Sequence, residues 1–158
     1  MKPTAWAATA LVLAALATAC ASGPPRRVSP PATSFQQVTV NADGSWAVAL
    51  RLQNYSSVPM RFENVRLAVT LGDQDAGTLE AAPQFSIGPE SADVYQATLQ
   101  PTSAARMLVA DALATRRSLA YTLEGSVQAS PEDARSRSFE VKARSTLTPI
   151  PGLDGVLR

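Results

Sequence analysis

The sequence predicts an all-β protein: an antiparallel β-sandwich of the immunoglobulin or fibronectin-III-like type, with about seven strands and one short helix. Apolar and polar residues alternate over most of the chain after residue 34, which is the period of a strand. Turn-forming residues interrupt the alternation roughly every 8–12 residues. A single segment after residue 103 has helical spacing instead. A small closed barrel is the alternative architecture, and a true immunoglobulin domain is not indicated because its Cys–Trp–Cys spacing is absent.

The first strands are expected over residues 35–40 and 46–53. In the second strand, even positions from Trp46 to Leu52 are apolar, whereas Arg51 and Gln53 are polar. Residues 41–44, Asn-Ala-Asp-Gly, form a turn sequence, so the two strands are expected to pair as a hairpin.

The next strand is expected from Met60 to Leu71, after a loop at residues 54–59. Its apolar positions are even up to Phe62 and odd from Val65, and an extra residue near Glu63 that forms a β-bulge explains the switch. Residues 72–77 are a turn cluster. A short strand at 77–81 follows, with an extension at 84–87 before Gly88 and Pro89.

The second half of the chain is expected to hold the helix and the last strands. After a strand at 92–99, Thr102 or Ser103 is suited to be the N-cap of a helix that runs from Ala104 to about Ala114. Arg116 and Arg117 suit the C-terminal end of this helix. The remaining expected elements are strands at 119–127 and 139–143, a turn at 130–133 and an irregular tail at 147–152 along a sheet edge.

The N-terminus has the pattern of an export signal. A lysine at position 2, an apolar stretch from Ala5 to Ala17 and small residues up to Ala19 are its three parts. This stretch is shorter than the roughly 20 residues of a membrane-spanning helix. The run from Leu16 to Cys20 resembles the bacterial lipobox, so we expect cleavage after Ala19 and a lipid on Cys20. An ordinary signal that leaves a free thiol is the alternative.

Lipid on Cys20 predicts a location in the bacterial cell envelope. Each buried methylene contributes about 0.8 kcal/mol, so two or three acyl chains hold a protein at a membrane permanently. The next residue is Ala21, where enteric bacteria use Asp as an inner-membrane retention signal, so we expect the outer membrane and a periplasmic domain. The predicted division is a lipoprotein signal peptide at 1–19, a lipidated Cys and Pro-rich tether at 20–34, and a β-sandwich domain at 35–158.

Composition argues against most catalytic and metal chemistry. The chain has no histidine and one cysteine, so neither a His-containing catalytic pair nor the usual zinc ligand set can form. The acidic pairs Asp73/Asp75 and Glu132/Asp133 both lie in turn sequences, which explains them without a glycosidase-like or metal site. The sequence predicts no catalytic residue, cofactor or metal. A formal net charge of +1 also argues against a nucleic-acid partner.

Three single residues have both a structural and a functional interpretation. Asn54 either contacts a ligand from its loop or, as we favour, bonds nearby backbone and sets the turn. Gly125 is expected to allow close strand packing or a bulge. Trp46 lies on the alternating apolar face, so core packing is favoured over sugar stacking.

Several segments resemble the type-2 late embryogenesis abundant family, also called the WHy domain. In that family a strand runs into an Asn-Pro-Asn loop, and residues 49–62 are similar to it, with Asn54 kept and Tyr55 and Ser56 in place of Pro and Asn. The further similar segments are 65–71, 77–79, 86–89, 119–125 and 148–151. The resemblance covers residues 35–151.

The resemblance implies a fibronectin-like sandwich without catalytic residues and a link to stress or desiccation protection. Bacterial members are often exported lipoproteins. We therefore expect a non-enzymatic, membrane-anchored envelope lipoprotein. The alternative is an accessory binding or assembly lipoprotein that holds a protein partner at the outer membrane, which an exposed apolar patch of several hundred Å² would favour.

Overall fold

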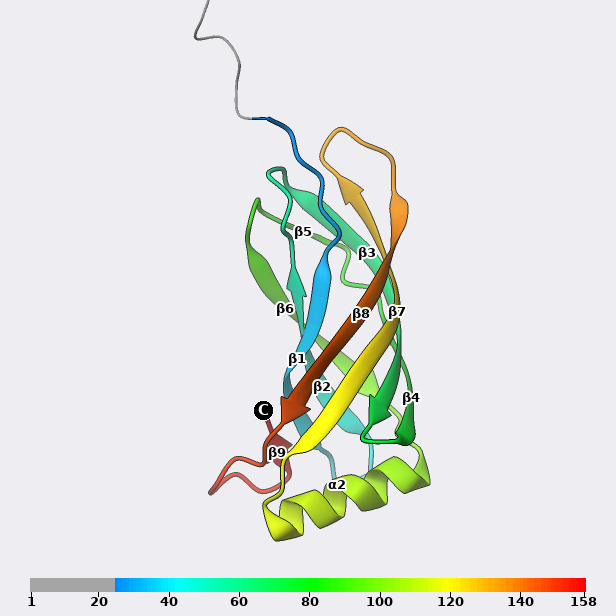
Figure 1. The fold of residues 1–158 in the computed structure, drawn as a ribbon, viewed down its shortest axis with the longest axis vertical. Coiled ribbons are helices and arrows are strands. Elements are labelled where there is room, and N and C mark those ends of the chain that lie inside the picture. The colour runs from blue at the N-terminus through cyan, green and yellow to red at the C-terminus, as the bar shows by residue number, and fades with distance from the viewer. Residues whose placement is uncertain (1–24) are drawn as a thin grey trace, which may run out of the picture.

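The computed structural model describes residues 25–158, which form nine strands and one helix (Figure 1). In chain order, the elements are β1 (Ala32–Val40), β2 (Trp46–Gln53), β3 (Met60–Leu71), β4 (Gln74–Ala81), β5 (Phe85–Ile87), β6 (Ala92–Leu99), α2 (Ser103–Thr115), β7 (Leu119–Pro131), β8 (Arg137–Leu147) and β9 (Val156–Leu157). The seven long strands are those that the sequence predicts, and β5 lies within the predicted extension at 84–87. The short strand β9 is additional.

The strands form two antiparallel sheets, which confirms the sandwich. One sheet has the order β6-β2-β1-β9, and the other has the order β4-β3-β7-β8 with β5 beside β3. The strands run along the long axis of the molecule, and α2 lies across one end (Figure 1). The predicted hairpin of β1 and β2 is present, with Val40 opposite Trp46.

Alternate residues of the long strands fill the core between the sheets. Burial of one such aliphatic side chain stabilises the fold by about 1.5–3 kcal/mol. Phe35 and Tyr121 join the sheets directly: their rings stack with centroids 4.9 Å apart, and the Phe35 N–H donates to the Tyr121 hydroxyl at 3.0 Å. The largest side chains that are almost completely buried include Trp46, Leu50, Leu52, Phe62, Leu67 and Leu123.

The contact between β3 and β7 explains two sequence features. The register of this pair shifts between Phe62 and Asn64, which confirms the bulge predicted from the change in apolar parity. Gly125 lies opposite Leu67, and a Cβ atom at Gly125 would lie 2.1 Å from the carbonyl oxygen of Arg66. Only glycine fits this close approach, as the packing interpretation predicts.

Helix α2 closes one end of the sandwich. Its N-cap is Thr102, whose hydroxyl accepts from the Ala105 N–H at 3.2 Å, and it ends at Arg116 in the left-handed conformation. The buried face of the helix carries Ala105, Val109 and Ala112. The predicted helix at 104–114 is thus confirmed to within one residue at each end.

The structure corrects several predicted strand boundaries. Strand β1 begins three residues before the predicted strand start at 35, because Ala32 continues the hairpin opposite Gln53. Strands β4, β7 and β8 are also longer than the predicted strands at 77–81, 119–127 and 139–143. Near the end of the chain, Val156 in β9 pairs with Thr39 of β1, and the predicted irregular tail at 147–152 lies beside β9, where Pro149 bridges Leu157.

Candidate functional site

The predicted lipidation residue, Cys20, and the signal peptide at 1–19 lie outside the described residues. Both predictions therefore stay predictions. No helix within residues 25–158 combines the length and the apolarity needed to cross a membrane. In sequence, the described residues closest to Cys20 begin at Pro25. This segment lies at the end of the sandwich opposite α2 (Figure 1).

Residues 25–29 are bound to the loop between β2 and β3, and we call this region of the molecule the anchor end. The Arg27 N–H donates to the Ser57 hydroxyl at 2.8 Å, and the Ser57 N–H donates to the Arg27 carbonyl at 3.0 Å. The Ser29 N–H donates to the Ser56 hydroxyl at 3.0 Å. This part of the predicted tether is therefore not free, because serine hydroxyls of the loop satisfy its backbone.

The Arg27 side chain adds two further contacts at the anchor end. Its guanidinium donates to the Tyr55 carbonyl at 3.1 Å and to the Glu90 carboxylate at 2.9 Å. Neighbouring Arg26 lies 3.6 Å from Asp133 in a second ion pair. These pairs are exposed and add little stability singly. Together they connect the N-terminal segment to three loops of the sandwich.

Asn54 is the buried centre of the anchor end. Its side chain is fully buried, and Nδ2 lies 2.9 Å from the Val58 and Gly88 carbonyls and 3.2 Å from that of Ile87. Its Oδ1 accepts from the Ser56 N–H at 2.8 Å. The prediction that Asn54 sets its turn is confirmed. The bonds to residues 87 and 88 also tie this turn to the loop before β6, which the sequence does not predict.

Of the acidic residues singled out in the sequence, Asp73, Glu132 and Asp133 lie in turns, whereas Asp75, which was predicted in a turn, lies near the start of β4. Asp75 accepts from the Gly77 N–H at 2.9 Å, and Asp133 pairs with Arg26. In the described range, no group of three or more acidic or cysteine side chains is placed to hold a metal ion. Trp46, 2 % exposed, packs in the core as predicted and faces no ligand site.

Two carboxylates have lowered pKa values. Hydrogen bonds from the Ser130 and Ser136 hydroxyls lower the pKa of Glu63, and bonds from the Ser45 hydroxyl and backbone lower the pKa of Asp43. Both groups are therefore ionised at neutral pH. A general acid needs the opposite shift, so neither carboxylate is tuned for that role.

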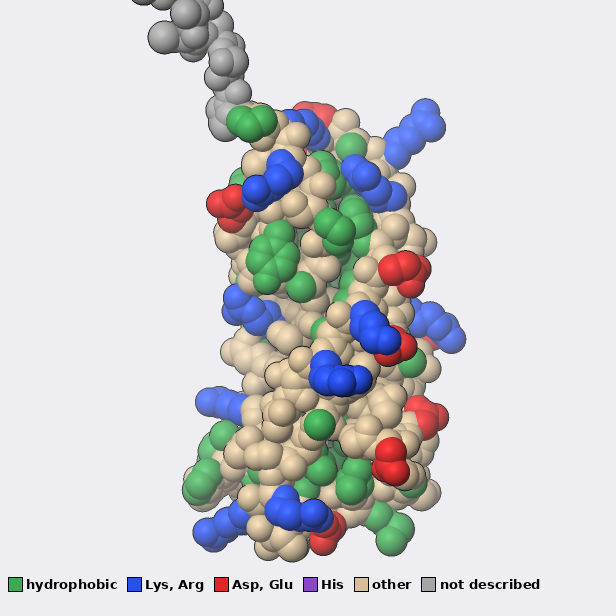
Figure 2. Space-filling view, in the orientation of Figure 1, with side chains coloured by type: hydrophobic (Ala, Val, Ile, Leu, Met, Phe, Trp, Pro, Cys, Tyr) green, Lys and Arg blue, Asp and Glu red, His purple; other side chains and the backbone are tan. Residues whose placement is uncertain are grey.

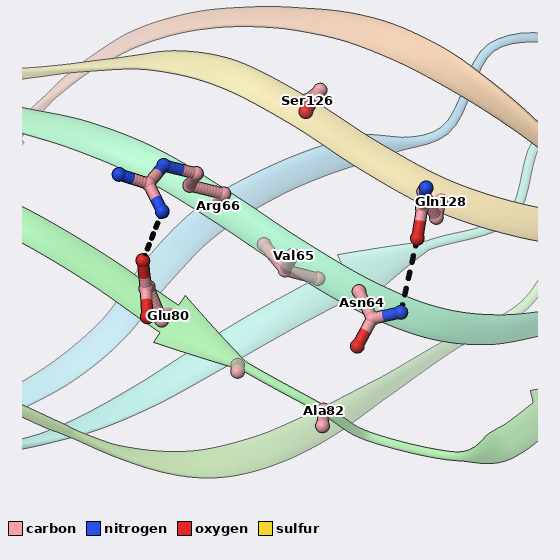
Figure 3. Close-up of a pocket in the computed structure, with 8 residues that line it drawn as sticks. Asn64, Val65, Arg66, Glu80, Ala82, Ser126 and Gln128 are labelled. Carbon is pink, nitrogen blue, oxygen red and sulfur yellow. Dashed lines mark hydrogen bonds and ion pairs between the residues drawn. The ribbon is translucent and has the colours of Figure 1, made fainter.

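The outer face of the five-stranded sheet carries an open pocket of about 520 Å³, which we call the outer-sheet pocket (Figure 3). It forms where β3 changes its partner: Val65 pairs with Ala81 of β4, but Phe62, beyond the bulge, pairs with Phe85 of β5. The pocket is lined by Asn64, Val65, Arg66, Glu80, Ala81, Ala82, Ser126 and Gln128.

Two side-chain pairs border the outer-sheet pocket. Asn64 Nδ2 donates to Gln128 Oε1 at 3.0 Å, and Arg66 forms an ion pair with Glu80 (Figure 3). Among the described residues, Asn64 Oδ1, Gln128 Nε2 and the Ser126 hydroxyl have no bonding partner. These groups can donate and accept hydrogen bonds. With no histidine in the chain, nothing here activates Ser126 as a nucleophile.

Sequence reasoning missed this pocket. Its residues are outward-facing positions of three strands, and a polar residue on the solvent face of a strand is unremarkable by itself. The one usable signal is the parity switch near Glu63, because a bulge often re-aims side chains at a functional position.

A second cavity of about 470 Å³, the distal groove, lies between the end of α2 and the C-terminal tail. Polar and apolar surface contribute almost equally to its lining, and Arg116 and Asp154 are its charged members. Leu153 in the lining is 50 % exposed, and Met107, on α2 but outside the lining, is 75 % exposed. The other apolar lining residues are Leu113, Ala114, Pro149, Ile150 and Pro151.

Charges of both signs are interspersed over the face of the molecule shown in Figure 2. Apolar side chains on this face form small separate groups rather than one continuous area. Ligand selection on such a surface depends on local hydrogen bonds and shape more than on a long-range field.

Comparisons with known proteins support the architecture. The family model for the late embryogenesis abundant protein matches residues 49–145. The solution structure of AT1g01470 from Arabidopsis thaliana is similar with a TM-score of 0.51 and 10 % identity, over 85 % of this chain and 87 % of that one. The solution structure of At2g46140.1, which bears the late embryogenesis abundant name, gives a TM-score of 0.50 and 15 % identity over 94 % and 90 %. No curated protein sequence matches this chain.

Proposed function

Because this chain belongs to the late embryogenesis abundant protein family, we propose that it is a non-enzymatic envelope lipoprotein whose sandwich is anchored to a membrane by lipid on Cys20. The observation that carries this proposal is the fixed attachment of residues 25–29 to the anchor end. A chain that leaves the domain at one defined point, shortly after a lipobox-like cysteine, is suited to hold that domain at a surface.

The short sequence separation between Cys20 and the sandwich restricts which end of the domain would face the membrane. Five residues lead from Cys20 to Pro25, and an extended chain spans at most about 3.6 Å per residue, so this connection reaches about 18 Å. A lipid on Cys20 would thus keep the anchor end beside the bilayer. Helix α2 and the distal groove, at the opposite end of the long axis, would point away from it (Figure 1).

The proposed location is the outer membrane, with the domain in the periplasm, because Ala21 is not the retention residue of enteric bacteria. The proposed role is stress or desiccation protection through contact with the membrane or with envelope proteins. Family membership supports this role.

The distal groove favours a second candidate function. In this alternative, the chain is an accessory lipoprotein that holds a protein partner at the outer membrane. Leu153 lines the groove and is half exposed at the end that would face away from the membrane. An exposed apolar side chain beside polar lining residues is suited to contact with a partner protein, whose interfaces combine an apolar centre with a polar rim.

Metabolic labelling with a palmitate analogue tests the anchor. The wild type, Cys20→Ala and Ser22→Ala are expressed, labelled and separated into inner-membrane, outer-membrane and soluble fractions. We expect label on the wild type and on the control Ser22→Ala, both in the outer membrane, and an unlabelled Cys20→Ala. A wild type that is unlabelled and soluble in the periplasm would overturn the proposal. Recovery of label in the inner membrane would overturn only the outer-membrane location.

Site-specific photocrosslinking separates the two candidate roles. A crosslinking residue replaces Leu153 at the distal groove or, as a control, the exposed Gln96 on β6. One discrete crosslinked protein at 153 and none at 96 would support the accessory role. Crosslinks at neither position, together with lower survival of drying in a strain that lacks the protein, would support protection.

A further inference from the structure

We propose that the outer-sheet pocket binds a neutral saccharide about the size of a disaccharide (Figure 3). This site is independent of the proposed anchor. The volume of about 520 Å³ lies within the range of small-molecule sites, roughly 300–1,000 Å³. The pocket is open rather than enclosed, and both polar and apolar atoms line it, so specificity depends on the hydrogen bonds that its polar side chains offer.

The shape of the pocket is set by the pairing of the strands rather than by the rotamers of exposed side chains. The bulge at Glu63 and the change of partner from β4 to β5 leave a depression beside residues 63–65 of β3. On the other side, β3 pairs with β7 from Leu71 opposite Tyr121 to Met60 opposite Pro131. This long pairing fixes the relative positions of residues 64, 66, 126 and 128, so the site exists before any ligand binds.

The unpaired groups in the pocket match a ligand rich in hydroxyls. The bond from Asn64 Nδ2 to Gln128 Oε1 fixes the orientation of both amides. Asn64 Oδ1 is then left as an acceptor and Gln128 Nε2 as a donor, and the two point away from each other (Figure 3). Each hydroxyl of a saccharide both donates and accepts, so neighbouring hydroxyls can satisfy both amides and Ser126.

The charge of the pocket selects against ions. Arg66 and Glu80 are the only charged groups in the lining and form an ion pair, so their net charge is zero. A phosphorylated or carboxylated ligand would gain from Arg66 but would meet the carboxylate of Glu80. A neutral hydroxyl pair can bond to both members without breaking their contact.

Small apolar residues complete the lining. Ala81 and Ala82 lie where β4 ends, and neither projects far enough to fill the depression. Their methyl groups offer an apolar patch for the C–H face of a pyranose ring. The described lining has no aromatic side chain for stacking, so we expect dissociation constants in the millimolar range, about −4 kcal/mol at 1 mM.

An NMR titration of the full ¹⁵N-labelled chain tests the proposal. The chain is purified with its natural N-terminus in a zwitterionic detergent, because a sugar-headed detergent would compete for the site. Maltose and trehalose are the probes, glycine betaine is a solute without hydroxyls, and trialanine amide is a short peptide. We expect saturable shifts with a disaccharide at residues 64–66, 80–82 and 126–128. Betaine and the peptide should cause none there.

Variants assign the binding to the pocket. Gln128→Ala should raise the dissociation constant about tenfold by removing one donor, equivalent to about 1.4 kcal/mol. Gln96→Ala is the matched control, since it removes the same amide from an exposed position on β6 of the other sheet, outside the lining. Unchanged spectra away from the pocket will show that each variant is folded. Cys20→Ala should bind like the wild type, so failure of the anchor proposal and failure of this one are distinguishable.

Three results would overturn the proposal. Shifts that do not saturate, or that betaine reproduces, would reveal a general solvent effect. Equal weakening by Gln128→Ala and Gln96→Ala would show that binding does not occur at the pocket. Saturable shifts with trialanine amide and none with either disaccharide would identify the pocket as a peptide site.

Discussion

The two ends of the sandwich are closed by different kinds of contact. At the anchor end, the fully buried polar residues Asn54 and Ser56 bond to backbone of the loops and the N-terminal segment. At the distal end, α2 covers the core with Ala105, Val109 and Ala112. Directional bonds depend on atom type, whereas apolar packing depends on volume and tolerates similar shapes. The anchor end should therefore be the more sensitive to conservative substitution.

Loop geometry explains the difference. The loops at the anchor end turn the carbonyls of Val58, Ile87 and Gly88 toward the interior, and buried carbonyls need donors. At the distal end, the helix satisfies its own backbone, so only its first and last turns need partners. Apolar side chains are then sufficient to close that end.

The largest expected effect is at Asn54. Asn54→Ala removes the donor shared by three carbonyls and should lower the free energy of unfolding by about 3 kcal/mol. Asn54→Asp keeps the shape but replaces the donor with an acceptor, so it should destabilise at least as much. Asn64→Ala, on an exposed strand position, is the control and should cost less than about 0.5 kcal/mol. Urea unfolding measures all three. A mild Asn54→Asp would contradict the polar account of the anchor end.

The next largest loss of stability is expected at Val109, which lies on α2 at the distal end and is 2 % exposed. Val109→Ala should cost about 2 kcal/mol through lost burial and a cavity. Val109→Ile, a change of shape rather than of chemistry, should cost less than about 1.5 kcal/mol. Urea unfolding curves of the two Val109 variants, compared with those of the Asn54 variants, show which end of the sandwich tolerates conservative substitution better. If Val109→Ile is as damaging as Asn54→Asp, the ends do not differ in the way described.

A smaller effect is expected at the one polar contact that begins α2. Thr102 accepts from the Ala105 N–H and donates to the Asp75 carbonyl at 2.6 Å, so Thr102→Ala should cost about 1 kcal/mol. Thr115→Ala is the control, because its hydroxyl donates to the Asp111 carbonyl and accepts from Arg117 Nε but caps no backbone N–H. Thermal unfolding followed by circular dichroism distinguishes them. Equal thermal unfolding midpoints for the two variants would show that the Thr102 cap does not stabilise the distal end.

The distal end could be predicted from sequence far better than the anchor end. The helix and its N-cap, predicted as Thr102 or Ser103, follow from local sequence, which depends on neighbours in the chain. The bulge near Glu63 also follows from local periodicity, although it lies toward the anchor end. Asn54 was assigned to a turn correctly, but its bonds to residues 87 and 88 join distant segments. The docking of Arg27 and Ser29 has no periodic signature. The outer-sheet pocket depends on strand register, which becomes visible only in the assembled sheet.

The smallest expected effect is a loss of stability in acid at each end of the sandwich, because each end holds one carboxylate with a lowered pKa. Glu63 at the anchor end accepts from Ser130 and Ser136, and Asp43 at the distal end accepts from Ser45. A folded-state pKa below the unfolded value contributes stability above the unfolded pKa. That stability is lost as pH falls through the folded value. Both contributions should therefore disappear below the ordinary values of 4.5 for Glu63 and 3.8 for Asp43.

The two contributions should differ in what they loosen. Glu63 joins β3 to the β7–β8 hairpin, whereas Asp43 bonds within its own turn. The loss of stability begins near the ordinary pKa, which is higher for Glu63 than for Asp43, so acidification should speed hydrogen exchange at residues 132–136 before it does so at 41–45. Glu63→Gln should weaken the pH dependence of the hairpin, while Glu132→Gln, in the same hairpin but outside this network, should leave it unchanged. If the turn at 41–45 opens first, the bonds of Glu63 resist acid better than those of Asp43. The claim that the anchor end depends more on directional polar bonds than the distal end does would then be contradicted.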